Sequence, residues 1–219
     1  WFGAGSNAFA VLVHEIGHGL GLAHPHNESG DPSGDPAFPG VTTWSSLGDF
    51  GLNQGIYTVM TYNSGFAEVG LPISHDFGRE AGPMAFDIAA VQRFYGANAA
   101  TNLGDTTFAL PGANAAGTGR LAISDAGGGG PLSPGTPRLA AIIDLRAATL
   151  LNAPGGGGYV SRVGGVMGGF TIANGVVIET ARGGLGNDLL HGNAADNLLD
   201  GGAGRDTVAY SGVSANLTI

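Results

Sequence analysis

The 219-residue chain contains no cysteine and no lysine. The lack of cysteine excludes thiol catalysis, thiolate-bound zinc and disulfides, although it leaves the cellular compartment undecided. The lack of lysine excludes Schiff-base chemistry, a P-loop and a Ser-Lys dyad. The eight basic residues, all arginine, are outnumbered by 17 acidic ones, giving a formal net charge of -9. We therefore expect no nucleic-acid partner, while an acidic chain suits the binding of divalent cations.

Long apolar runs are also missing, so we expect no membrane span. No basic segment followed by an apolar one marks a signal peptide, and because the chain starts at Trp1 we interpret it as part of a longer protein. A hydrophobic content of 43% is enough for a core. Most of the 42 glycines lie beyond Gly112, which predicts two domains, at residues 1–100 and 101–219.

Two helices are predicted in the first domain, at 7–20 and 83–95. Ser6 is a suitable N-cap for the first, and Gly21 ends it. Pro83 occupies the first position of the second, Asp87 lies near its positive end, and Gly96 closes it. The predicted apolar stripes are Ala8, Val11, Leu12 and Ile16 in the first helix, and Met84, Ile88, Val91 and Tyr95 in the second.

Irregular and β-type segments fill the rest of the chain. Residues 25–55 are rich in Pro, Gly, Asp and Ser, which predicts a long surface loop. Short β-type runs at 121–123, 141–145 and 175–178 are separated by glycine and proline clusters such as 127–130 and 155–158. The second domain is therefore predicted to be rich in β-structure.

Three histidines have the spacing of a metal site. His14 and His18 are four residues apart on the predicted helix, so both imidazoles project from one face and can share an ion. A turn at Gly21 would bring His24 back as a third ligand, which matches catalytic zinc with its fourth position open. Glu15 lies beside this site and can act as general base without binding the metal. The bland alternative is a helix that merely carries histidines.

The run from His14 to His24 resembles the metzincin signature H-E-x-x-H-x-x-G-x-x-H, and Met60 in TVMTY (58–62) resembles its Met-turn. Pro25 after the third histidine and Tyr62 two residues after the methionine resemble the serralysin branch. That resemblance implies that Tyr62 is a further zinc ligand that swings away to hydrogen-bond the oxyanion, and that Met60 forms an apolar floor. The helix at 83–95 also resembles the segment that closes the serralysin catalytic domain, and we assign it no chemistry.

The last forty residues contain a nine-residue period, in units 183–191, 192–200 and 201–209. The pattern G-G-x-G-x-D-x-U-x is that of RTX repeats, which bind calcium in a β-roll. We predict that Leu189, Leu198 and Val208 are in phase as core residues. Units one and three should stack, so that Asp188 and Asp206, 18 residues apart, face one calcium. The predicted calcium ligands are Gly184, Gly186, Asp188, Gly202, Gly204 and Asp206.

Other candidate sites are weaker. The middle repeat has Asn197 where aspartate is expected, so it should bind calcium weakly or not at all. Gly104–Thr106 with Asp125–Gly127, and Glu179 before the repeats, resemble serralysin calcium sites at the domain join. His26, His75 and His191 are interpreted as surface or loop histidines.

The predicted fold class is α+β: the C-terminal part of a metzincin zinc-protease domain followed by an all-β, calcium-binding parallel β-roll. The resemblance implies a secreted zinc metalloendopeptidase, requiring Zn²⁺ and Ca²⁺ and acting on protein or peptide substrates, and we expect a monomer. Since only residues 1–6 precede the zinc helix, we expect a fragment that lacks the family's substrate-binding sheet, binds zinc and cleaves poorly. The alternatives are a non-enzymatic RTX calcium-binding or adhesin-type protein with a vestigial zinc site, and a zinc hydrolase of small esters or amides.

Overall fold

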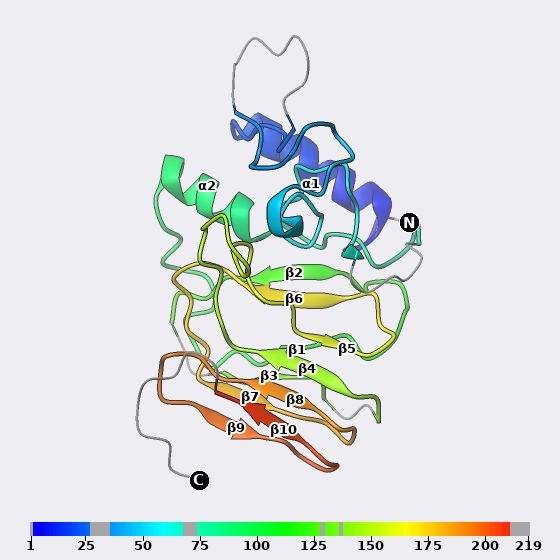
Figure 1. Ribbon diagram of the computed structural model, residues 1–219, viewed down its shortest axis with the longest axis vertical. Helices are drawn as coiled ribbons and strands as arrows, with labels where there is room; N and C mark the ends of the chain where they lie inside the picture. The colour runs from blue at the N-terminus through cyan, green and yellow to red at the C-terminus, as the bar shows by residue number, and fades with distance from the viewer. Residues whose placement is uncertain (1, 27–35, 68–73, 128–129, 136–137, 211–219) are drawn as a thin grey trace.

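The computed structural model describes residues 2–26, 36–67, 74–127, 130–135 and 138–210. Two helices, α1 (Asn7–Gly19) and α2 (Ala85–Tyr95), and the short 3-10 helix η1 (Asp49–Gly51) lie at one end. Layers of short strands form the other end (Figure 1). The mixed helix and strand content predicted from the sequence is therefore confirmed, and the helices and strands are segregated along the chain.

Helix α1 begins and ends where its sequence predicts. The Ser6 side chain accepts a hydrogen bond from the Phe9 backbone N–H at 3.3 Å, and Gly21 turns the chain away with φ +91°. The predicted apolar stripe does not face the core, however, because Val11, Leu12 and Ile16 are exposed. Instead the helix packs through the small residues Ala10 and Gly17, which are its buried positions.

Helix α2 starts two residues later than predicted. Its first residue is Ala85 and its N-cap is Met84, so Pro83 precedes the helix and the prediction that it opens the first turn is wrong. Asp87 sets this boundary, because its carboxylate accepts the Met84 backbone N–H at 2.8 Å. Within the predicted stripe Met84 is fully buried, while Tyr95 is 65% exposed. The Tyr95 hydroxyl donates to the Leu20 carbonyl at 3.3 Å and joins the ends of the two helices.

The segment predicted as a surface loop is only partly one. Part of it, 27–35, lies outside the described residues, and η1 interrupts the rest. Residues 52–61 are buried: Asn53 is fully buried and Gln54 is 2% exposed. The prediction is wrong there because these polar side chains bind backbone carbonyls, Asn53 donating to Ser46 and Gln54 to Gly51.

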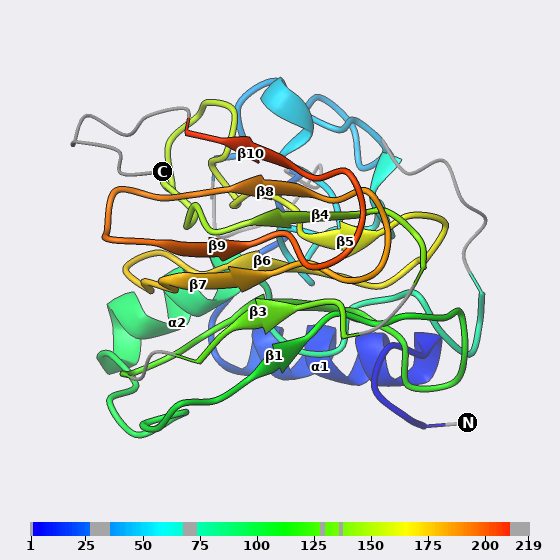
Figure 2. The same ribbon diagram turned by 90° about the horizontal axis from the view of Figure 1, so that it is seen from below.

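In the part of the chain that the structure describes, ten short strands form three sheets, of order β1-β3-β7-β9, β10-β8-β4-β5 and β2-β6. All pairings are parallel except that of β4 with β5. The β2-β6 pair lies between the helices and the two larger sheets (Figure 1), which form separate layers when seen from below (Figure 2). The strands are β1 (Phe108–Ala109), β2 (Arg120–Ile123), β3 (Leu132–Ser133), β4 (Ala141–Asp144), β5 (Arg162–Val163), β6 (Gly169–Ile172), β7 (Thr180–Arg182), β8 (Leu189–His191), β9 (Leu198–Asp200) and β10 (Thr207–Ala209).

The last four strands begin at residues 180, 189, 198 and 207, nine residues apart, and alternate between the two larger sheets. Units one and three therefore stack as predicted, with Leu190 paired to Val208. In the third repeat the predicted core residue, Val208, is in phase with Leu190. In the first two repeats the prediction is wrong by one position: Leu190 is fully buried and Leu199 packs on the core, whereas Leu198 is 58% exposed. Leu189 is likewise only partly buried, because successive side chains of a strand point to opposite faces.

Two of the three predicted β-type runs are strands, β2 and β4. The third, 175–178, is not: Gly175 forms a turn with φ +81°, and the ladder resumes only at Thr180. The run is apolar because part of it is buried: Ile178 is fully buried, while Val177 is 50% exposed. Segment 78–81 joins the helical end to the strands, because Ala81 donates its backbone N–H to the Arg120 carbonyl at 2.8 Å.

Candidate metal centre

The structure brings His14, His18 and His24 together. Their Nε2 atoms are separated by 3.1 Å for His14 and His18, 3.0 Å for His18 and His24, and 3.2 Å for His14 and His24. Among the described residues these form the one group of three or more His, Cys, Asp or Glu side chains close enough to hold an ion. Two ligands about 2.0 to 2.1 Å from a tetrahedral zinc would be about 3.3 Å apart, so the spacing fits zinc.

Hydrogen bonds behind the rings fix which nitrogen faces inward. His14 Nδ1 lies 2.9 Å from the Val59 carbonyl oxygen, and His18 Nδ1 lies 2.8 Å from that of Leu22. A carbonyl can only accept, so each Nδ1 carries a proton and each neutral ring directs the lone pair of Nε2 at its neighbour. Two lone pairs 3.1 Å apart repel each other unless one of the nitrogens is protonated or a cation lies between them. A cation between them removes this conflict, and so the residues fit a metal ion.

Met60 lies beneath this cluster. It is 2% exposed, and its sulfur would lie 2.5 Å from a Cβ placed on Gly17. Gly17, between the two helical histidines, therefore allows α1 to approach the methionine closely. Glycine is a poor helix former, so this close approach lowers the stability of the helix interior. This is the position predicted for an apolar floor.

Glu15 and Tyr62 border the cluster. Glu15 is exposed, and with His14 and Tyr62 it lines a hollow of about 250 Å³. The Tyr62 ring is 5.8 Å from that of His14 and 4.7 Å from that of His24, measured between centroids. The base and the phenol predicted from the sequence thus lie on the open side of the histidines.

Asp87 is a site residue that sequence reasoning missed. Its carboxylate accepts the Thr58 hydroxyl at 2.6 Å and the Val59 backbone N–H at 2.7 Å, and the Val59 carbonyl in turn faces His14. Burial raises the pKa of Asp87 to about 6, against the lowering effect of these hydrogen bonds. The carboxylate therefore holds in place the turn that carries Met60. Its place at the start of α2 was visible in the sequence, but its contact across 28 residues was not.

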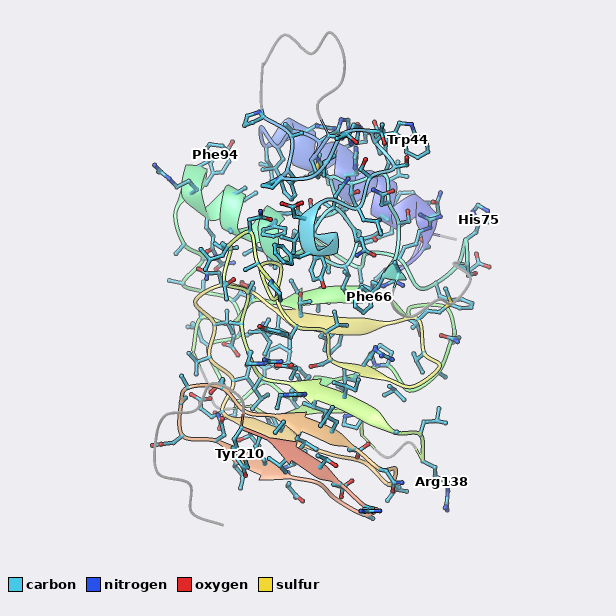
Figure 3. All side chains as sticks on the ribbon, in the orientation of Figure 1. Trp44, Phe66, His75, Phe94, Arg138 and Tyr210 are labelled. Carbon is cyan, nitrogen blue, oxygen red and sulfur yellow. The ribbon has the colours of Figure 1, made fainter. Side chains whose placement is uncertain are left out.

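His26 is a loop histidine, as predicted, but it is buried and does not lie at the surface. It is 5% exposed, and its ring lies parallel to that of His24, with centroids 4.8 Å apart and an interplanar angle of 8°. The chain turns back at Gly21 and folds this residue beside the site. His75 is exposed and points away from the body of the molecule, as expected (Figure 3). His191 lies in β8, half-buried, and so in a strand rather than a loop.

The predicted calcium residues lie in two stacked turns. Asp206 Oδ1 accepts the Asp188 backbone N–H at 2.9 Å. Asp188 is 2% exposed, and its two carboxylate oxygens accept the backbone N–H groups of Ala141 at 2.7 Å and Gly184 at 2.6 Å. The four glycines lie at the contact of the two turns: a Cβ on Gly202 would meet the Gly184 carbonyl oxygen at 2.5 Å. Added side chains at Gly204 would likewise meet the Gly186 carbonyl oxygen.

The weaker calcium candidates are also placed. Segment 101–106 lies against 124–127 and Gly130, since Ala126 donates its backbone N–H to the Thr101 carbonyl at 2.9 Å and a Cβ on Gly130 would meet the Thr106 carbonyl oxygen. Asp125 Oδ2 and Glu179 Oε2 are buried without a hydrogen-bond partner among the described residues. In the middle repeat, Asn197 Oδ1 accepts the Asn193 backbone N–H at 2.7 Å, so an amide replaces the carboxylate of the flanking units.

Three histidines, two on α1 and one after it, lie close enough together to hold one metal ion. The chain is 36% identical over 208 residues to metallopeptidase AprA of Pseudomonas marginalis, and 36% identical over 203 residues to serralysin of Proteus mirabilis. Each comparison covers 86% of this chain. Serralysin G of Dickeya chrysanthemi is 33% identical over 204 residues. The predicted resemblance to serralysin-type metalloproteases is therefore confirmed.

Residues 178–208 match the family of the RTX calcium-binding nonapeptide repeat, which confirms the repeats. The chain spans 38% of the Pseudomonas marginalis relative, 36% of the Proteus mirabilis one and 37% of the Dickeya one, well under half of each. No helix among the described residues is long and apolar enough to cross a membrane.

Proposed function

We propose that this chain carries the catalytic centre of a secreted, zinc-dependent endopeptidase that hydrolyses peptide bonds in proteins. The observation that carries the proposal is the convergence of three Nε2 atoms within 3.2 Å, two of which have lone pairs directed inward. The names of the relatives, metallopeptidase and serralysin, support the same activity.

His14, His18 and His24 would hold the zinc, with the carbonyls of Val59 and Leu22 orienting the first two. When bound, zinc supplies a Lewis acid that makes water a stronger acid and polarises a carbonyl oxygen. Asp87 and Met60 keep the turn beneath the histidines in one arrangement.

Glu15 is the proposed general base. From the open side of the cluster it takes the proton of the attacking water and returns it to the leaving amine. Tyr62 is the proposed switching residue. It would be a further zinc ligand that moves away and donates a hydrogen bond from its hydroxyl to the developing oxyanion. Its 47% exposure supports this proposal, because the ring has room to move.

We propose residues 1–100 as a metzincin-type catalytic domain and residues 101–219 as a calcium-binding β-roll. The stacked turns at Asp188 and Asp206 would share a calcium, together with carbonyls of Gly184, Gly186, Gly202 and Gly204. A calcium site with the affinity of extracellular calcium-binding modules suits an extracellular protein. The chain would be a monomer and would act on protein or peptide substrates.

The test is hydrolysis of a quenched fluorescent peptide by the zinc-loaded chain and by Glu15→Gln. Because Glu15 is not one of the three proposed zinc ligands, the variant should keep its zinc while losing at least about 100-fold in rate. A chain that binds zinc but cleaves peptide at the same rate with and without Glu15 would contradict the proposed base. A chain that takes up no zinc would instead favour the non-enzymatic RTX protein.

A further inference from the structure

The three histidines of the proposed zinc site are held in different ways. His14 and His18 lie on α1, and each ring is also fixed by a backbone carbonyl. His24 lies beyond the Gly21 turn, outside any helix or strand, so no regular element sets the direction of its ring. A ligand on an irregular segment needs other contacts if its nitrogen is to stay within 3.2 Å of the other two.

His26 provides such a contact. It is buried, and its ring covers one face of His24 with the two planes 8° apart. The same ring packs at 4.7 Å from the ring of Tyr62, which in turn lies 4.7 Å from His24. Three rings from two segments 36 residues apart therefore contact one another in pairs. The segment that carries two of them is tied down, because the Pro25 carbonyl accepts the Phe38 backbone N–H at 2.8 Å.

His26 is not a fourth member of the nitrogen cluster. The group whose ligand atoms lie within 4.8 Å of one another contains His14, His18 and His24 only, among the residues described. The face of the His26 ring, and not a nitrogen aimed at the ion, is what the site uses. Offset stacking of this kind restricts both rings to a narrow range of orientations.

We propose that His26 is a positioning residue, whose ring face holds His24 in the orientation that zinc binding requires. This inference rests on the proposed zinc site. Groups that orient metal ligands change metal affinity by roughly 10 to 100-fold when removed. His26 would act by stacking, where the two helical histidines rely on carbonyl acceptors.

The experiment measures Zn²⁺ affinity by competition with a chromophoric chelator, together with the visible absorption of the Co²⁺-loaded protein. His26→Ala removes the ring, His26→Leu keeps bulk without an aromatic face, and His26→Phe keeps the face without a nitrogen. We expect His26→Ala and His26→Leu to bind Zn²⁺ at least about 10-fold more weakly and to alter the Co²⁺ spectrum. His26→Phe should restore both readouts, and His75→Ala, at an exposed histidine, should change neither.

Wild-type affinity in His26→Ala would overturn the inference, as would binding by His26→Phe as weak as that by His26→Leu. If His26→Ala does not fold, as judged by circular dichroism, the comparison of the Phe and Leu variants decides. A wild-type chain that binds no Zn²⁺ would instead contradict the proposed function itself, which separates the two failures.

Discussion

Predicted metal ligands lie together at both the helical end and the repeat end of the molecule, but the hydrogen bonds of these ligands differ between the two ends. In the histidine cluster, hydrogen bonds point away from the centre and leave the Nε2 atoms of His14 and His18 facing each other. In the repeats, both carboxylate oxygens of Asp188 already accept backbone N–H groups, and the Gly184 carbonyl accepts that of Ala203.

This contrast bears on what each metal would do. The histidine cluster is arranged in advance, with the Nε2 atoms of His14 and His18 already facing each other, so zinc should bind without changing the fold. In the stacked turns the Asp188 carboxylate and the Gly184 carbonyl already accept backbone N–H groups. Because a carboxylate oxygen has a second lone pair for a cation, Asp188 should contribute to stability with or without calcium.

Substitution of Asp188 should have the largest effect on stability. Asp188→Ala leaves the buried N–H groups of Ala141 and Gly184 without acceptors, and each loss costs about 1 to 3 kcal/mol. We expect roughly 2 to 6 kcal/mol less stability in urea unfolding with a calcium chelator present. Asp196→Ala, at an exposed position of the middle repeat, is the matched control. If Asp188→Ala lowers stability only when calcium is present, the two ends do not differ in the way described.

Asp87 tests the helical end through pH. Its pKa is raised from 3.8 to about 6, so the folded state retains a proton that the unfolded chain releases between these values. Stability from that proton is complete below about pH 4 and is lost as the pH rises through about 6, a difference of roughly 3 kcal/mol. Asp87→Asn should lack this loss.

The measurement is urea unfolding of the metal-free protein across this range, comparing wild type with Asp87→Asn. Other titrating groups, the histidines included, are common to both proteins, so their contributions cancel in the difference. A wild-type curve parallel to that of Asp87→Asn at every pH would contradict the assignment of the raised pKa to Asp87.

Substitution of Gly17 should give the smallest change in stability. Its sign should be opposite to that of the same substitution at Gly19. Gly17→Ala forces Met60 to move, at a cost of about 1 to 3 kcal/mol that outweighs the better helix propensity of alanine. Gly19→Ala meets nothing within 4 Å and should gain up to about 1 kcal/mol. Thermal unfolding compares the two. Equal stabilisation by both substitutions would show that Met60 does not lie tightly against α1.

Local signals predicted the elements that depend on local physics. The Ser6 cap, the Gly21 turn and the nine-residue period each act within a few residues, and the structure has all three. Burial was harder to predict. The stripe on α1 is apolar yet exposed, and polar Asn53 is fully buried, because tertiary hydrogen bonds and neighbouring layers decide these positions.

The candidate site divides in the same way. The spacing of the histidines on α1 made their convergence predictable. His26 and Asp87 could not be assigned, because their importance comes from contacts with Tyr62 and Val59, far along the chain. The first two repeats were assigned one position out of phase, since Leu189 and Leu190 are both apolar and only the register with β4 and β10 decides which one faces inward.

The most direct test of the central claim is titration of Zn²⁺ into the metal-free chain, calcium chelated, for wild type and for His14→Ala, His18→Ala and His24→Ala. We predict one tight Zn²⁺ per wild-type chain, loss of that binding in each variant, and unchanged circular dichroism throughout. Tight binding that survives removal of any one of the three histidines, or no tight binding by the wild-type chain, would contradict the assignment of this cluster as the zinc centre.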